Sequence, residues 1–200
     1  MQYLGSFVQA TIDASPEAIW NIISDVTRHP ELAGSGQVEK VEVLDPAGLG
    51  EGAIFQSNQN INGVRYITAS RVRVWEPPYR FAWQVGTGLL PGVAQLWYFE
   101  LTPQGMGTQV ENGVVSPVPM PDLLPFSLLH DAIGQADVQS VQPTLANLAG
   151  MLGVAEPSYY KESLRANPSM AALLPSPWLF AGGAGIALLG GLALLRRGRT

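Results

Sequence analysis

Two strand-like runs separated by a pair of prolines occupy residues 64–86, which read VRYITASRVRVWEPPYRFAWQVG. Residues 64–75 and 80–86 are rich in β-branched and aromatic side chains, and Pro77-Pro78 marks a turn between them. Runs of the same kind, with glycine or proline between them, lie at 37–44, 53–60, 93–102 and 108–116. Because short turns join antiparallel neighbours, these six runs predict an antiparallel sheet.

Helical segments flank this series of strands. Before it, residues 7–12 predict a seventh strand, and Ser15-Pro16-Glu17 predicts a helix start with an N-cap serine followed by proline. Residues 28–32 predict a second, short helix. After the strands, residues 122–153 have helical spacing, although Pro143 is expected to kink or interrupt that helix. The order predicts an α+β fold in which the terminal helix covers one face of a seven-stranded sheet.

Six short sequence motifs occur in an order that is typical of one superfamily. They are ASPEAIW at 14–20, RHPE at 28–31, GAIF at 52–55, WEPPYRFAW at 75–83, WYFELTP at 97–103 and GTQV at 107–110. On these residues the chain resembles the START-like (SRPBCC) superfamily, in its polyketide cyclase/dehydrase and lipid-transport branch. The resemblance implies a helix-grip, Bet v 1-like fold with a cavity under the long helix. It implies no single reaction, because the members include cyclases, lipid carriers and quinone-binding proteins.

One position departs from the pattern of that family. Where many relatives have a glutamate two residues after the GTxV word, this chain has Asn112. An amide does not titrate, so a carboxylate that could have served as an acid or base is missing. The remaining catalytic candidates are His130 and Asp131, but adjacent residues of a helix point in different directions, which favours a solvated pair. The sequence therefore favours a role without catalysis and leaves an enzymatic role open.

Alternate residues of a strand share one face, and the more apolar alternation predicts which side chains point inward. Together with two leucines of the terminal helix they form the predicted ligand-binding set, which is Phe55, Ser57, Tyr66, Thr68, Phe81, Trp83, Trp97, Phe99, Val110, Asn112, Leu124 and Leu128. Rings and aliphatic groups with a few neutral polar groups are typical of pockets for apolar molecules. The same side chains could fill a packed core, and only the family resemblance favours an open pocket. His29 is open to two interpretations, an exposed or capping residue, which we favour, and a residue at the pocket mouth.

The composition limits the classes of partner. The net charge is −5, and an acidic chain does not suit nucleic acid, whose phosphates require clustered lysine and arginine. The chain has no cysteine and only two histidines, so we predict neither a metal site nor a cofactor.

Apolar residues are concentrated near the C-terminus. Residues 178–195 carry no charge, begin with Trp178 and precede Arg196-Arg197, which predicts one transmembrane helix at 177–196. We expect a single-pass membrane protein with its domain in the cytoplasm. Within this stretch Gly183, Ala187 and Gly191 recur every four residues, a small-residue stripe that could support a homodimer.

The expected organisation follows from these segments. It comprises a ligand-binding domain at 1–153, a proline-rich linker at 154–176, the transmembrane helix and a basic tail at 197–200. The favoured function is a membrane-tethered binding or carrier protein for a hydrophobic small molecule, such as a lipid, a quinone or a polyketide-like compound. The alternatives are an aromatase/cyclase-type or dehydratase enzyme and an adaptor that recruits a protein to the membrane.

Overall fold

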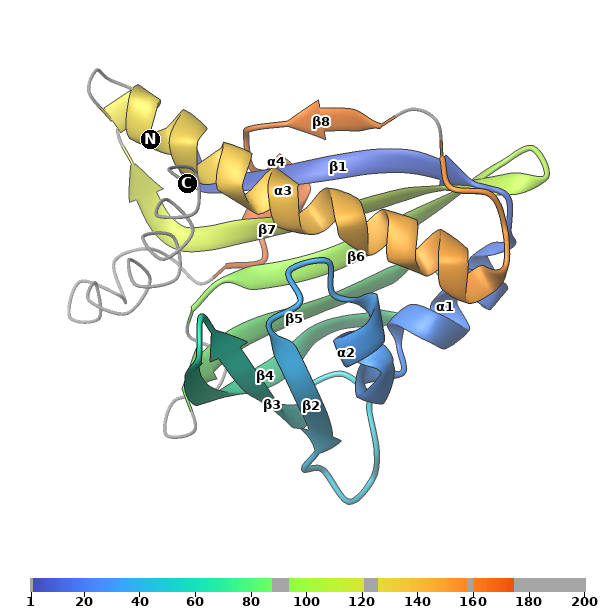
Figure 1. Ribbon diagram of the computed structural model, residues 1–200, viewed down its shortest axis with the longest axis horizontal. Coiled ribbons are helices and arrows are strands. Elements are labelled where there is room, and N and C mark those ends of the chain that lie inside the picture. Colours follow the sequence, from blue (N-terminus) through green and yellow to red (C-terminus); the bar gives the residue numbers. More distant parts are fainter. Residues whose placement is uncertain (1, 88–93, 121–125, 158–159, 175–200) are drawn as a thin grey trace.

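The computed structural model describes residues 2–87, 94–120, 126–157 and 160–174 (Figure 1). The elements, in chain order, are β1 (Gln2–Ile12), α1 (Pro16–Ile23), the 3₁₀ helix η1 (Val26–Arg28), α2 (His29–Leu32), β2 (Val38–Val43), β3 (Ile54–Ile61), β4 (Val64–Glu76), β5 (Arg80–Thr87), β6 (Leu96–Gln104), β7 (Gly107–Met120), α3 (Phe126–Leu152), β8 (Lys161–Ser163) and α4 (Pro168–Ala171).

The strands form one antiparallel sheet in the order β2-β3-β4-β5-β6-β7-β1-β8. The predicted α+β helix-grip architecture is confirmed, but the described residues form a sheet of eight strands where the sequence predicted seven. The additional strand is β8, which pairs with β1 so that Phe7 lies opposite Ser163. A three-residue strand in a proline-rich stretch is too short to show the alternation that reveals a strand in sequence.

Helix α3 lies across one face of the sheet, mainly over β1 and β7, and we call this the inner face (Figure 1). Val138, Val141, Leu145 and Leu148 are buried, and their spacing of three or four residues places them on one side of α3. The expected interruption at Pro143 does not occur, because the helix continues to Leu152. Pro143 lies on the exposed side, and burial on both sides of it offsets its missing hydrogen bond.

The short helices close one end of the inner face. Ser15 caps α1 as the sequence predicted, since its side-chain oxygen accepts a hydrogen bond from the Ala18 amide at 3.3 Å and Pro16 follows. After α2 the chain contacts α3, where the Gly34 amide donates a hydrogen bond to Thr144 Oγ1 at 2.9 Å. These helices therefore position α3 against the sheet from the side.

The opposite face of the sheet, which we call the outer face, is also covered. Tyr98 and Val115 are buried there in a cluster with Met170 and Leu174, which come from α4 and the turn after it. The segment expected as a linker at 154–176 thus contains β8, which pairs with β1, and α4, which packs on the outer face. The domain boundaries that the sequence predicted stay a prediction.

The predicted location in a membrane is corrected. Across the part of the chain that the structure describes, no helix is long and apolar enough to cross a membrane, which contradicts a single-pass location. The longest described helix, α3, carries Asp131 and Asp137, which hydrocarbon would leave unsatisfied. The predicted helix at 177–196 and its stripe of Gly183, Ala187 and Gly191 lie outside the described residues.

Candidate ligand-binding site

Aromatic side chains from three strands gather on the inner face. In the register of β5 and β6, Phe81 lies opposite Phe99 and Trp83 lies opposite Trp97. The ring centroid of Trp83 is 5.0 Å from that of Phe81, 6.2 Å from that of Phe99 and 6.3 Å from that of Phe55 on β3. Phe55, Phe81 and Phe99 are buried, whereas Trp83 and Trp97 are only partly buried. Solvent therefore reaches the inner face beside the two indoles.

A β-bulge in β4 brings a further tryptophan to this face. The register between β4 and β5 shifts between Val72 and Val74, so that the alternation of side chains reverses and Trp75 joins the inner cluster. The Trp75 ring centroid lies 5.1 Å from that of Trp20 on α1 and 5.5 Å from that of Phe81. Uninterrupted alternation along 64–75 would have placed Trp75 on the outer face, which is why sequence analysis did not include it.

His29, the first residue of α2, lies among these rings. Its ring centroid is 5.2 Å from that of Trp83, 6.3 Å from that of Phe81 and 6.4 Å from that of Phe55. Only 7% of the residue is exposed, and burial holds the pKa of the imidazole below its usual value. Its Nε2 lies 2.9 Å from the Ile23 carbonyl oxygen. The interpretation of His29 as an exposed or capping residue is therefore replaced by a buried, neutral imidazole inside the aromatic cluster.

Small polar groups stand beside the rings. The register places Ser70 of β4 opposite Phe55, and Ser57 of β3 opposite Thr68. Ser57 and Ser70 are buried, and neither hydroxyl has a hydrogen-bond partner among the described residues. Asn112 is held differently, because its Nδ2 donates a hydrogen bond to the Tyr98 carbonyl oxygen at 2.8 Å. The inner face thus offers hydroxyls and an amide but few internal partners for them.

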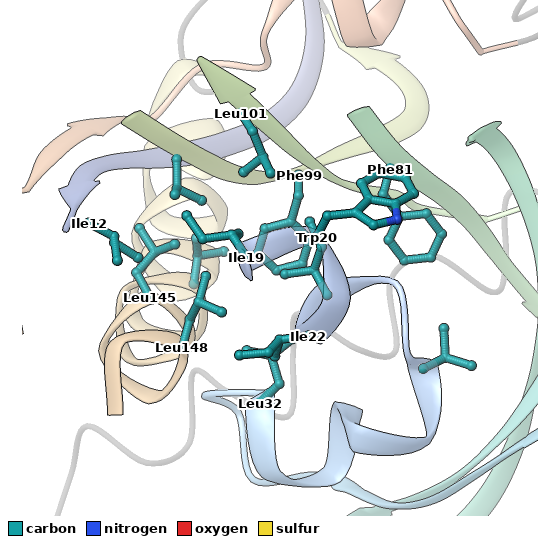
Figure 2. Close-up of a cluster of buried hydrophobic side chains, with 14 of the residues drawn as sticks. Ile12, Ile19, Trp20, Ile22, Leu32, Phe81, Phe99, Leu101, Leu145 and Leu148 are labelled. Carbon is teal, nitrogen blue, oxygen red and sulfur yellow. The ribbon is translucent and has the colours of Figure 1, made fainter. Parts of the chain in front are cut away.

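Helix α3 supplies the opposing wall at its C-terminal half. Leu145 and Leu148 extend from α3 into the cluster that contains Ile12, Ile19 and Leu101 (Figure 2). The cluster is continuous with the aromatic side chains, since Trp20, Phe81 and Phe99 belong to it. Packed aliphatic groups fill this half of the interface. The inner face is accessible to solvent at the partly buried indoles of Trp83 and Trp97.

One carboxyl group of α3 has unusual surroundings. Asp137 precedes the buried Val138 and lies one helical turn before Val141, so it borders the buried side of the helix. It is partly buried, and it has no hydrogen-bond or ion-pair partner in the described ranges. Burial raises the pKa of Asp137 to about 7. Sequence analysis missed this residue, because a single aspartate in a helix carries no signal of its burial.

The outer face holds a buried polar network behind the rings. The Tyr98 hydroxyl donates to one oxygen of Glu111 at 2.7 Å, and the Asn167 amide donates to the same oxygen at 2.6 Å. The Gln9 amide donates to the other oxygen of Glu111 at 2.6 Å. Burial and the Glu111 carboxylate raise the pKa of Tyr98 far above its usual range, so the hydroxyl stays a donor. This network ties β1, β6, β7 and the C-terminal segment together, and so fixes the strands that carry the inner residues.

Comparison of the sequence with family models shows to which family the chain belongs. Residues 7–150 match the model of the family described as polyketide cyclase/dehydrase and lipid transport. The chain belongs to that family. Proteins of the polyketide cyclase/dehydrase family bind hydrophobic small molecules, which indicates a hydrophobic ligand-binding domain in this member. No curated protein matches the chain closely enough to count as a relative.

Solved structures share the fold of this family member at low sequence identity. Protein NE0264 from Nitrosomonas europaea is 15% identical with a TM-score of 0.56, and the match covers 75% of this chain and 94% of that chain. Zhui aromatase/cyclase from Streptomyces sp. R1128 is 15% identical with a TM-score of 0.54, with coverage of 76% and 94%. TTHA0849 from Thermus thermophilus is 19% identical with a TM-score of 0.51, with coverage of 74% and 96%. At these identities the likeness concerns the fold alone.

The structure brings together most of the ligand-binding set that the sequence predicted for this family member. Phe55, Ser57, Phe81, Phe99, Val110 and Asn112 are buried, and Thr68, Trp83 and Trp97 are partly buried. Tyr66 does not join them, because it is 40% exposed near the β3–β4 turn. Leu124 lies outside the described residues, and Leu128 lies in α3 with its side chain outside the description. A role for these residues in binding stays a prediction.

Of the weak catalytic candidates His130 and Asp131, the structure describes only the side chain of Asp131, so a catalytic role stays a prediction. The Asp131 carboxylate accepts a hydrogen bond from Arg165 Nη1 at 2.6 Å, and both side chains are more than 40% exposed. The side chain of His130 lies outside the description. Among the described residues no group of three or more potential ligands could hold a metal ion.

Proposed function

We propose that this domain binds a hydrophobic small molecule between the inner face of the sheet and α3, and carries it chemically unchanged. The proposal depends on one observation above all, namely that Trp83 and Trp97 point inward beside buried rings and yet remain partly accessible to solvent. An indole face that is neither fully packed nor on the outer surface suits a flat or chain-like apolar guest. A lipid, a quinone or a polyketide-like molecule has this character.

Extraction of the purified protein tests the proposal directly. The full chain is purified without detergent, extracted with organic solvent, and the extract is analysed by mass spectrometry. We expect one dominant apolar compound at a substantial molar fraction of the protein. A protein that gives an empty extract, and that also fails to take up N-phenyl-1-naphthylamine in a fluorescence titration, would contradict the proposal.

A pair of variants locates the binding site. Trp83→Ala removes the central ring of the cluster, and we expect it to weaken N-phenyl-1-naphthylamine binding at least tenfold, since one stacked aromatic contributes on the order of 1 kcal/mol beyond its buried area. Tyr79→Ala is the matched control, because Tyr79 is 46% exposed and lies outside the inner cluster. Equal weakening in both variants would place the probe elsewhere. Circular dichroism of each variant distinguishes lost binding from lost folding.

A second candidate is an enzyme of the aromatase/cyclase type. The observation in its favour is that two titratable groups, His29 and Asp137, adjoin the interior and that neither forms an ion pair with a described residue. A neutral imidazole can accept a proton and a protonated carboxyl group can donate one. The test is turnover of a linear poly-β-ketone by the wild type and by the double variant His29→Gln, Asp137→Asn. Unchanged turnover in the double variant would remove this candidate.

A further inference from the structure

One nitrogen of the His29 ring forms no hydrogen bond with the described part of the chain. Because a carbonyl oxygen only accepts hydrogen bonds, the 2.9 Å contact with Ile23 places the imidazole hydrogen on Nε2. The second ring nitrogen, Nδ1, then carries a lone pair. Among the described residues nothing donates a hydrogen bond to it, although His29 is more than nine-tenths buried.

Nδ1 is not one of the fully buried polar atoms without a partner, which among the described residues are Ser6 Oγ and Arg80 Nε, so a small molecule can reach it. Of the three rings in contact with His29, Phe55 and Phe81 have no donor, and the indole N–H of Trp83 forms no hydrogen bond with Nδ1. The Ser57 and Ser70 hydroxyls point from the same face of the sheet but donate to no described residue either. His29 Nδ1 is therefore available to accept a hydrogen bond from a bound ligand.

The charges of the inner face restrict the kind of molecule. Arg71 and Arg73 of β4 lie on the outer side, where Arg73 Nε donates to Gln84 at 2.9 Å and Arg71 Nη1 donates to the Gly52 carbonyl oxygen at 3.0 Å. Arg80 of β5 lies on the same outer side, because it alternates with the inward Phe81. A carboxylate or phosphate on the inner face would therefore be desolvated without a cation from β4 or β5 to pair with. A neutral hydrogen-bond donor meets no such cost.

Resting on the proposed ligand-binding function, we propose that the ligand is a neutral aromatic molecule with a hydroxyl or N–H group, and that this group donates a hydrogen bond to His29 Nδ1 while the aromatic part lies against Trp83. The ring of Trp83 provides a flat surface for the aromatic part, and the hydrogen bond to His29 orients the ligand on that surface. A phenol is the simplest molecule with both properties. Its methyl ether has the same ring but no donor, and so isolates the hydrogen bond.

Calorimetric titration with 2-naphthol and with 2-methoxynaphthalene tests the inference on the wild-type full chain. The ether is the more hydrophobic of the two and would bind at least as tightly as the phenol if apolar contact alone decided affinity. We expect 2-naphthol to bind about tenfold more tightly, which corresponds to about 1.4 kcal/mol. In His29→Phe this preference should disappear, because phenylalanine fills the space and provides no acceptor.

Nitrogen NMR gives a second readout that needs no binding variant. The chain has only two histidines, His29 and His130, so the spectrum of ¹⁵N-histidine-labelled protein is simple, and His130→Gln identifies which signals belong to His29. A donated hydrogen bond shifts the Nδ1 resonance of His29 on addition of 2-naphthol. Addition of 2-methoxynaphthalene should leave that resonance in place.

The outcomes separate this inference from the proposed function. If both probes bind with equal affinity and Nδ1 does not shift, the inference is overturned while ligand binding stands. If neither probe binds and N-phenyl-1-naphthylamine does not bind either, the proposed function fails and the inference fails with it. If His29→Phe does not fold, the two wild-type titrations and the NMR shift still decide the question.

Discussion

Asp137 shows how strongly the environment of one residue can act on the whole fold. Its pKa rises from 3.8 to about 7 because burial disfavours the ionised carboxylate. A group whose pKa is higher in the folded state than in the unfolded state favours folding at low pH and opposes it as the pH rises. The cost therefore develops between about pH 4 and pH 7 and stays constant above that range.

Replacement of Asp137 by asparagine should remove this cost. We expect Asp137→Asn to raise the free energy of unfolding at pH 8 by about 2–4 kcal/mol, a range reduced for the partial exposure of the side chain, and to have a smaller effect at pH 4.5. Urea denaturation at both values measures the difference, in which the titration of His29 cancels because both proteins contain it. Asp131→Asn is the control on the same helix, since its exposed ion pair with Arg165 contributes at most about 1 kcal/mol at either pH. A pH-independent effect of Asp137→Asn would contradict the assignment.

At the scale of elements, α3 is held in place by close contact with the chain that follows α2. A Cβ atom added to Gly34 would lie 2.5 Å from both the Ser140 carbonyl oxygen and the Thr144 amide nitrogen. The side-chain amide of Asn147 also donates to the Leu32 carbonyl oxygen at 3.2 Å, so the chain after α2 lies directly against the helix. This approach requires glycine for reasons of space.

Gly34→Ala should therefore destabilise the protein by about 1–3 kcal/mol, because the helix has to move to admit the methyl group. The control is Gly150→Ala on α3, where nothing lies within 4 Å of the added Cβ. Alanine is the better helix former, so we expect this control to gain about 0.5–1 kcal/mol. Thermal denaturation of the two variants gives the comparison, and a neutral Gly34→Ala would show that α3 is not packed against this turn.

At the scale of the whole molecule, both faces of the sheet are covered, by α3 on the inner side and by the C-terminal segment on the outer side. Met170 is fully buried on the outer face, near Tyr98 and Val115, and Asn167 donates to the buried Glu111. The segment therefore contributes to the stability of the domain and does not merely follow it.

Truncation of one side chain in this segment tests that statement. Met170→Ala should lower the free energy of unfolding by about 2–4 kcal/mol, through lost burial and the cavity left behind. Leu173→Ala, three residues on, removes a side chain of a residue that is 37% exposed and should cost well under half as much. Chemical denaturation measures both, and equal small losses would show that the segment is dispensable for the fold.

Local pattern was sufficient for strands β1 to β7, the capped helix α1 and most of the inward-facing residues. A period of two places Phe81 and Trp83 on one side of β5, and Phe99 and Trp97 on the same side of β6, because a pleated strand has no other choice. Ser15-Pro16 specifies the start of α1 for an equally local reason, the capping of amide groups that have no other acceptor.

Contacts between distant parts of the chain account for the rest. His29 contacts Trp83, which is more than fifty positions away in the sequence. Trp75 points inward only because a bulge shifts β4 against β5. The proline-rich segment forms β8 and α4 only because β1 pairs with β8 and Tyr98 packs near α4. No periodicity within a short window encodes such contacts, since burial of one segment depends on the shape of another. The same reason explains why the acceptor on His29, which defines the proposed ligand, became visible only in the folded chain.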